Sequence, residues 1–234
     1  MLDILYLDDY LAVVNKPSGW QVHRTSLDKE ETHFVLQTLR DQIGQMVWPV
    51  HRLDKGTSGV LVFALSAEVA SALGQAFESG EGLHKTYRAI VRGWPADELL
   101  IDHPLRRMPD DMRHQRKEVQ SAQTRLQTLR RGELPIPQGL FPSLRWAEVQ
   151  LQPLTGRRHQ LRRHMKHIAH PIIGDATHGK GPLNRAVAAH LGVGRLWLHA
   201  LRLQMVHPVS GAALTVEAAA GPQWALWDAT RPAG

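Results

Sequence analysis

One carboxylate, Asp54, stands where it could act on a substrate. It follows Arg52 in the stretch VHRLDKGTSG, just before a continuous apolar run. A turn at Gly56 would place this carboxylate at the entrance of a buried strand, partly out of water. There it could serve as a nucleophile or as a general base. The alternative is a structural aspartate that caps the turn through the amides of Thr57 or Ser58.

A second candidate pair lies in the stretch LHKTYRAIVRG. Lys85 and Tyr87 are two residues apart on an expected strand, so both side chains point to the same face. A tyrosine on an alternating strand is ordinarily a core aromatic with a satisfied hydroxyl. The pair by itself therefore indicates no chemistry.

The densest basic signal is TGRRHQLRRHMKHIAHPIIGD, residues 155–175, in which we expect a helix over residues 157–168. Gly156 would leave free amides beside Arg157, an arrangement that suits a phosphate. The alternative is a solvent-facing charged stripe. On the expected helix, the residues at positions i, i+3, i+4 and i+7 of one face are His159, Arg162, Arg163 and Lys166.

Arg162 differs from the other cations of this segment. It follows Leu161, which belongs to the apolar face, so Arg162 lies near the edge of the buried side. A guanidinium in that position needs a carboxylate partner.

The charge distribution favours a polyanionic partner. Residues 151–207 carry nine Lys or Arg against one acid, Asp175, whereas residues 1–150 carry 18 bases and 19 acids. Positive charge gathered in one part of a chain is typical of a nucleic-acid-binding face. The alternative is a solvated basic surface.

Several classes of chemistry are excluded or not supported. The chain has no cysteine, which excludes disulfides, thiolate metal sites and thiolate nucleophiles. His164, His167 and His170 recur every three residues, but they lack an H-E-x-x-H pattern and Pro171 would break their helix. No nucleotide-binding glycine motif is present. We therefore expect no metal and no cofactor.

Local patterns predict a mixed fold in which strands often follow one another directly. We expect a single α+β domain over residues 1–234, with a largely antiparallel sheet. The acidic N-terminus has no signal-peptide pattern, so the expected location is cytoplasmic. The expected strands are 4–7, 11–14, 59–65, 85–93, 120–129, 144–151, 196–205 and 214–218, and the expected helices are 32–43, 67–79, 157–168 and 183–191.

Taken in order, six stretches of the chain resemble the RluA-type pseudouridine synthases. HRLD-x-x-TSG and GR-x-HQ-x-R are highly specific as a pair, and the match spans nearly the whole chain. The stretches are NKPSGWQVH, HRLDKGTSG, KTY, GRRHQLRRH, HPIIGD and LWLHALRL, at residues 15–23, 51–59, 85–87, 156–164, 170–175 and 196–203.

The resemblance implies isomerisation of uridine to pseudouridine in RNA, without a cofactor. It also implies a mostly antiparallel mixed sheet with flanking helices and a catalytic cleft. Asp54 matches the essential aspartate of the family, Tyr87 its active-site tyrosine, and Arg162 the arginine that pairs with the aspartate. Arg52 matches the residue that enters the space left by the flipped uridine. The residues implied to contact RNA or substrate are Arg52, Lys85, Arg157, His159, Arg163, Lys166 and Leu198.

Within the family, GD-x-x-HG followed by NR and a short helix is most similar to the members that modify uridine 65 of tRNA. The expected partner is structured RNA, tRNA above ribosomal RNA, and the expected state is a monomer. Because the chain begins at the ILYLDDY element, we expect no separate N-terminal RNA-binding domain. Two features depart from the family. Lys55 and Gly56 follow the aspartate, and the polar, arginine-rich segment at 104–120, which we expect to be an exposed excursion between two strands, has no counterpart.

Three alternatives stay open at this point. Asp54 could attack C1′ or C6 of the nucleotide, or remove the proton at C2′. The chain could also be a catalytically silent RNA-binding module that kept the fold. A carboxylate-dependent hydrolase is disfavoured, because no second acid lies near the motifs.

Overall fold

The computed structural model describes residues 1–23, 33–108 and 118–230. The chain forms two compact units. The first contains Met1–Tyr87 and Leu198–Gly221, and the second contains Arg88–Trp197 and Pro222–Gly234. The expectation that residues 1–234 act as one catalytic domain stays a prediction.

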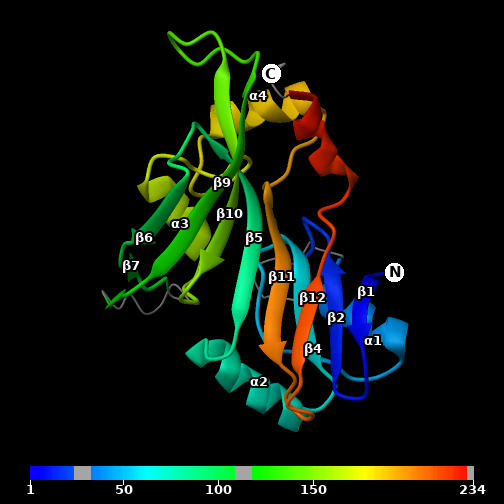
Figure 1. The fold of residues 1–234 in the computed structure, drawn as a ribbon. Coiled ribbons are helices and arrows are strands. Elements are labelled where there is room, and N and C mark those ends of the chain that lie inside the picture. Colours follow the sequence, from blue (N-terminus) through cyan, green and yellow to red (C-terminus); the bar gives the residue numbers. More distant parts are fainter. Residues whose placement is uncertain (24–32, 109–117, 231–234) are drawn as a thin grey trace. The chain divides into compact units, whose positions relative to one another are not determined.

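The first unit is built on a mixed sheet with strands in the order β1-β2-β4-β11 (Figure 1). Neighbouring strands are antiparallel, except that β11 runs parallel to β4. β12 pairs with β11 and the short β3 pairs with β4. The bounds are β1 Asp3–Leu7, β2 Leu11–Lys16, β3 Trp48–Pro49, β4 Ser58–Ala64, β11 Leu198–Val206 and β12 Ala213–Glu217.

Both faces of this sheet are covered, which explains why β4 reads as a continuous apolar run. Leu61 and Phe63 pack on one side with residues of α1, Val35–Ile43. Val60 and Val62 pack on the other side with residues of α2, Ala67–Ser79. All seven residues of β4 are buried.

Helix α2 begins and ends as its sequence indicates, whereas α1 begins later than expected. The Ser66 hydroxyl accepts a hydrogen bond from the amide of Val69 at 3.2 Å, so Ser66 caps the start of α2, which the sequence predicts at residue 67. Gly44 and Gly80 end α1 and α2 in the left-handed conformation that favours glycine. The helix expected over 32–43 begins at Val35, because Phe34 has extended backbone angles.

Strand β5, His84–Arg92, begins in the first unit and ends in the second. In the second unit the strand order is β5-β10-β9-β6, and β9 is antiparallel to both of its neighbours. Strands β7 and β8 form a separate pair. The bounds are β6 Glu98–Asp102, β7 Leu105–Arg106, β8 Val119–Gln120, β9 Gln123–Leu134, β10 Leu144–Pro153, α3 Gln160–His167, α4 Gly181–Leu191 and a 3-10 helix, η1, at Pro222–Thr230.

Four buried tryptophans close one side of the second unit. Trp224 and Trp227 of η1 meet Trp197 edge-on, with ring centroids 5.5 and 5.3 Å apart. Trp227 also meets Trp146 of β10 at 5.0 Å. Edge-to-face contacts of this kind stabilise aromatic pairs beyond the area they bury. The C-terminal segment is thereby fixed to the unit.

The expected α+β class with a large mixed sheet is confirmed. The strands outnumber the α-helices, and parallel pairing is limited to β4 with β11 among the pairings described above. The excursion expected at 104–120 begins with β7 and ends with β8, while 109–117 lie outside the described residues. In the part of the chain that is described, no helix combines the length and apolar character needed to cross a membrane.

Candidate active site and RNA-binding face

Asp54 lies in the loop between β3 and β4, where it is half-buried. The amide of Thr57 donates to the backbone carbonyl of Asp54 at 3.0 Å, so the turn closes through the main chain. Leu53 on one side and Thr57 on the other are buried. The loop is thus fixed at both flanks, and the carboxylate stands at the entrance of β4 as the sequence predicts.

The NKPSG segment holds this loop through a buried lysine. Lys16 is fully buried, and its ammonium donates to the carbonyls of Pro17, Lys55 and Thr57 at 3.0, 3.0 and 2.7 Å. The hydroxyl of Ser18 also donates to the carbonyl of Gly56 at 2.7 Å. A buried cation is tolerated here because acceptors surround it. The NKPSG motif therefore anchors the aspartate loop, a role that its sequence alone does not reveal.

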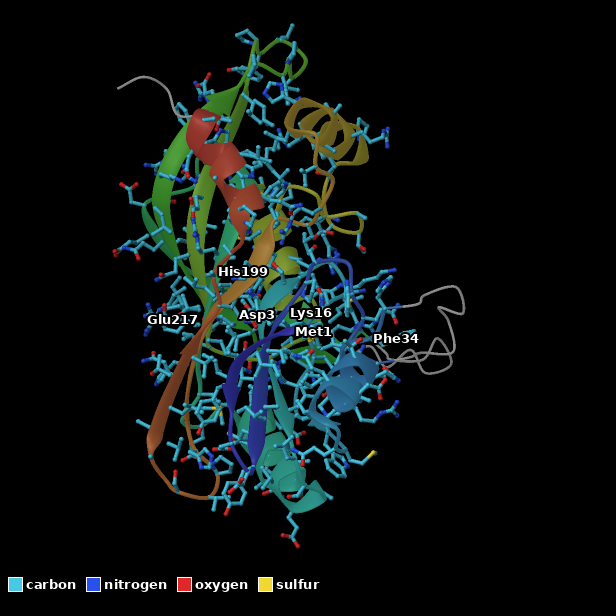
Figure 2. The ribbon with its side chains drawn as sticks, turned by 90° about the vertical axis from the view of Figure 1, so that its right-hand side faces the viewer. Met1, Asp3, Lys16, Phe34, His199 and Glu217 are labelled. Atoms are coloured by element: carbon cyan, nitrogen blue, oxygen red, sulfur yellow. The ribbon has the colours of Figure 1, made fainter. Side chains whose placement is uncertain are left out.

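A buried histidine holds the start of β4 from the other side. The Ser58 hydroxyl and Nδ1 of His199 are 2.9 Å apart, and Nε2 of His199 is 2.9 Å from the carbonyl of Ala218. The carbonyl can only accept, so Nε2 carries a proton, and in the neutral ring Nδ1 then accepts from Ser58. His199 and Lys16 are labelled in Figure 2.

Gly59 is required where β4 passes β11. A Cβ atom there would lie 2.1 Å from the carbonyl oxygen of Ala200, and the φ angle of Gly59 is +110°. Only glycine meets both conditions. The glycine of the TSG sequence is therefore required by the fold, in addition to any role in function.

Tyr87 and Lys85 project from β5 on the same side, as expected. Together with His51 and residues of β4 and β11 they line a small cavity of about 10 Å³. Burial and the negative charge of Asp54 raise the pKa of Tyr87, so its hydroxyl stays protonated at neutral pH. The carboxylate and the phenol are thus close enough to interact within the first unit.

His51 and Lys85 share the ring of Phe77. The imidazole stacks on this ring with centroids 4.4 Å apart, and the ammonium lies 4.6 Å from the ring centroid. Burial and the charge of Lys85 lower the pKa of His51 to about 3. Its Nε2 accepts from the amide of Val62 at 3.1 Å. His51 is therefore a neutral acceptor, and burial likewise lowers the pKa of Lys85.

The remaining candidates of the first unit differ in exposure. Arg52 is exposed, whereas Leu198, the first residue of β11, is buried. Their roles toward RNA stay predictions.

In the second unit, the helix expected over 157–168 begins only at Gln160. The buried side chain of Gln160 accepts from the amide of Arg157 at 3.0 Å and donates to the carbonyl of Gln123 at 2.9 Å. His159 then adopts a left-handed conformation with φ of 53°. The residues before Gln160 are therefore not helical, and sequence reasoning missed the anchoring role of this glutamine.

The expected basic face of this helix is wrong for His159, which lies outside the helix as its N-cap residue. Arg162 is buried with 7% exposure, as its position beside Leu161 predicts. Arg163 is half-buried and Lys166 is exposed, so these two remain available to a partner. Arg157 is half-buried, and its Nε donates to the carbonyl of Ser121 at 3.1 Å.

Arg162 forms a bidentate ion pair with Asp175 inside the second unit. Its Nε and Nη2 donate to Oδ2 and Oδ1 of Asp175, both at 2.8 Å. Burial alone would raise the pKa of Asp175, but hydrogen bonds from Arg162 and from the amides of His178 and Thr177 outweigh it and lower the pKa. The sequence predicts a carboxylate partner for Arg162, and the family resemblance implies that this partner is Asp54, which stays a prediction. The pairing with Asp175 is not predicted.

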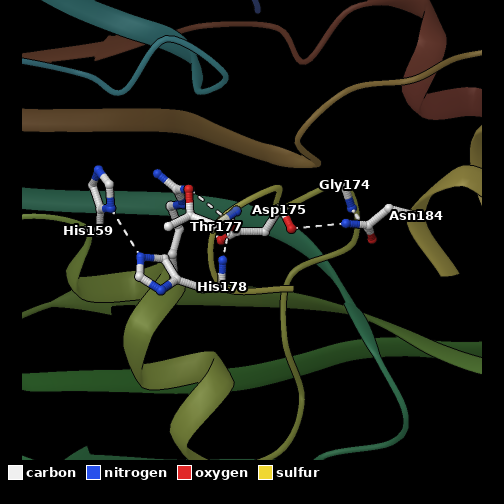
Figure 3. A network of polar contacts seen from close by, with 7 residues as sticks. His159, Gly174, Asp175, Thr177, His178 and Asn184 are labelled. Carbon is white, nitrogen blue, oxygen red and sulfur yellow. Dashed lines mark hydrogen bonds and ion pairs between the residues drawn. The ribbon is translucent and has the colours of Figure 1, made fainter. Parts of the chain in front are cut away.

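A short hydrogen-bonded loop supports this ion pair (Figure 3). The amides of Thr177 and His178 donate to Oδ1 of Asp175 at 2.9 and 2.8 Å. The ring of His178 contacts His159, with 3.1 Å between Nε2 and Nδ1. The loop therefore connects Asp175 to the residue that precedes α3.

His164 and His167 of this segment have partners within the second unit. His164 is fully buried between the hydroxyl of Thr124 at 2.9 Å and the carbonyl of His103 at 3.0 Å. His167 stacks on the ring of His103 with centroids 3.6 Å apart. Among the described residues, no three His, Asp or Glu side chains are grouped as metal ligands.

Comparisons with known proteins agree on one family. The sequence model for RNA pseudouridylate synthase matches residues 10–167. The chain is 50% identical over 228 residues to tRNA pseudouridine synthase C of Vibrio cholerae, covering 96% of this chain and 93% of the relative. The protein of the same name from Vibrio vulnificus is 49% identical, with the same two coverages. Among solved structures, human RNA pseudouridylate synthase domain containing 1 has a TM-score of 0.72 and 26% identity, covering 94% of this chain and 83% of that one.

Proposed function

The chain belongs to the RNA pseudouridylate synthase family, and from this premise we propose that it isomerises uridine to pseudouridine in tRNA, at uridine 65. The observation that carries the proposal is the similarity, over nearly the whole chain, to proteins named tRNA pseudouridine synthase C. The reaction is intramolecular: the bond from C1′ to N1 breaks, a bond from C1′ to C5 forms, and the C5 proton is replaced by one on N1. The enzyme is therefore an isomerase.

Asp54 is the proposed catalytic carboxylate. It stands in a loop that is held by the buried ammonium of Lys16 and by Ser18. A rigid loop keeps a carboxylate at one position relative to the ribose, which favours reaction over diffusion. Attack at C1′, attack at C6 and removal of the C2′ proton are each compatible with one such carboxylate.

Tyr87 is proposed to contact the detached uracil as a neutral phenol. Its pKa is raised by burial and by Asp54, so a phenolate is disfavoured at neutral pH. The hydroxyl can donate a hydrogen bond and the ring can lie against the base. Removal of the C5 proton by Tyr87 late in the reaction is the alternative role.

Arg162 is proposed to face Asp54 during catalysis, as the family resemblance implies. A guanidinium carries five N–H donors, and its two bonds to Asp175 use only part of them. The remaining donors could orient the catalytic carboxylate and keep it ionised. Asp175 would then act as a positioning residue, because it fixes Arg162 without touching the RNA.

The substrate is proposed to be held by cations and by flipping of the target base. Arg163 and Lys166 would contact phosphates, and Arg52 would enter the space left by the flipped uridine. Arg157, His159, Lys85 and Leu198 complete the proposed substrate-contacting set. We further propose that the enzyme acts as a monomer in the cytoplasm and needs no cofactor.

The test is a chemical map of pseudouridine in total RNA from cells with and without the gene. Loss of the modification at uridine 65 of tRNA in the deletion strain, and its return on complementation, is the expected result. Loss at a site in ribosomal RNA would assign the other substrate class. An unchanged map would contradict the proposal.

A further inference from the structure

The segment around α4 carries positive charge without acidic residues. Between residues 176 and 216 the chain has four Lys or Arg and no Asp or Glu. Two of these cations, Lys180 and Arg185, are exposed. Within the described residues, neither of these two side chains has an acidic partner, and the first turn of α4 contains no acid. Both charges are therefore available to an anion.

Lys180 and Arg185 lie at the same end of α4. Lys180 is the N-cap residue of this helix. The guanidinium of Arg185 reaches back along the helix, so that its Nη1 is 3.5 Å from the place of a Cβ atom at Gly181. Side chains on a helix lean toward its N-terminus, which explains this direction. Two cations at one end of a helix can contact neighbouring phosphates of one strand.

This end of α4 is tied to the loop that carries Asp175. The amide of Gly174 donates to Oδ1 of Asn184 at 2.9 Å, and Nδ2 of Asn184 donates to the carbonyl of Asp175 at 2.9 Å (Figure 3). Gly179 passes so close that a Cβ atom there would lie 2.4 Å from the same carbonyl. The start of α4, which carries the two cations, is thus fixed relative to Asp175 and its partner Arg162.

From this geometry we infer that Lys180 and Arg185 bind backbone phosphates of the substrate RNA. The inference rests on the proposed function, since the anion is taken to be the tRNA itself. RNA is favoured over an acidic protein because the chain belongs to the RNA pseudouridylate synthase family. Arg163 and Lys166 of the same unit add exposed or half-buried cations. Phosphate contacts position the RNA and carry no base specificity. They should therefore act on affinity for tRNA and on KM more than on kcat.

The test compares wild-type protein with the double variant Lys180→Ala/Arg185→Ala in tRNA binding at several salt concentrations. The double variant should bind tRNA on the order of ten-fold more weakly, and the slope of log affinity against log salt should fall by roughly 1 to 2. Arg125→Ala is the matched control, because it removes another exposed arginine, on β9. This control should keep the wild-type slope. Arg185→Lys should also keep it, since the charge remains.

A double variant that folds as shown by circular dichroism, yet binds with the wild-type slope, would overturn the inference. A uniform loss of binding in the Arg125→Ala control would equally contradict it, because the effect would then be general. Failure of the proposed function is seen separately: wild-type protein would then form no pseudouridine in tRNA, whatever its affinity.

Discussion

Arg162 and Asp175 form an ion pair whose side chains are both at least nine-tenths buried, with both carboxylate oxygens engaged at 2.8 Å. The carboxylate belongs to the HPIIGD stretch and the guanidinium to the GRRHQLRRH stretch, so one motif fixes a residue of the other. A bidentate pair restricts the guanidinium to one plane and one direction. The donors of Arg162 that do not face Asp175 therefore have a defined orientation.

Asp175→Asn should lower turnover by misplacing Arg162. The amide keeps one acceptor oxygen but removes the negative charge of Asp175 from a buried guanidinium, and breaking a buried pair in this way costs up to about 3–5 kcal/mol. Single-turnover rates should fall more than tRNA affinity does, and thermal melting should report the lost stability. Asp175→Glu should restore part of the rate, since the charge returns. A variant with wild-type single-turnover kinetics would show that Arg162 does not depend on Asp175.

Asp54→Asn should abolish pseudouridine formation while folding and tRNA binding persist. The amide has nearly the same shape as the carboxylate, but it is neither a nucleophile nor a base. Tritium release from labelled uridine measures turnover, and filter binding measures affinity. Asp9→Asn, at an exposed position of the β1-β2 turn, is the matched control and should be fully active. Measurable turnover in the Asp54 variant would remove this residue from the chemistry.

The sequence predicts the elements of the first unit well because local signals and tertiary packing agree there. The apolar run that becomes β4 is buried on both faces, and Ser66 and Gly80 mark the ends of α2 as expected. The continuous burial of β4 follows from helices on both sides of the sheet. Such agreement is typical of a segment with one dominant environment.

The second unit is harder to predict because its contacts are distant in sequence. Strand β9 extends to Leu134, five residues beyond the expected end, because it stays paired with β10 as far as Leu144. Strand β6 and helix η1 carry no clear periodic pattern, and η1 is held by tryptophan contacts with Trp146 and Trp197. Tertiary packing decides these elements.

In the candidate site, too, local patterns predict some residues, whereas contacts between distant parts of the chain decide the others. The spacing predicts that Arg162 lies at the edge of a buried face and has a carboxylate partner. The motif resemblance implies the catalytic roles of Asp54 and Tyr87. The partner Asp175 lies 13 residues from Arg162, across a helix end and a proline, so no helical spacing could identify it. The late start of α3 depends on hydrogen bonds from Gln160 to β9, which periodicity does not reveal.

Tyr87→Phe should lower turnover by less than about 100-fold, the lower bound typical of a lost general base. The raised pKa of Tyr87 keeps its hydroxyl protonated, so the wild-type rate should not rise with pH as a phenolate forms. Rates measured between about pH 6 and 9 should therefore have the same profile in both proteins. Tyr87→Ala should lose more, because the ring itself is removed. A wild-type rate that climbs with pH, combined with an inactive Phe variant, would instead identify Tyr87 as the base.

His51 should make the fold sensitive to mild acid. Its pKa is about 3 in the folded chain against 6.5 ordinarily, so its neutral form is favoured by folding. The contribution is present above pH 6.5 and is lost as pH falls, because only the unfolded chain then binds the proton. The loss from this group should reach about 2 kcal/mol at pH 5.

His51→Gln removes this titration but keeps an acceptor for the amide of Val62. Urea unfolding at pH 7.5 and pH 5 should show a smaller loss of stability in this variant than in the wild type. Some loss should remain, because burial also lowers the pKa values of His164 and His178. His84→Gln, at an exposed position beside Lys85, should behave as the wild type. Equal acid sensitivity in the His51 variant and the wild type would mean that His51 is protonated in the folded chain.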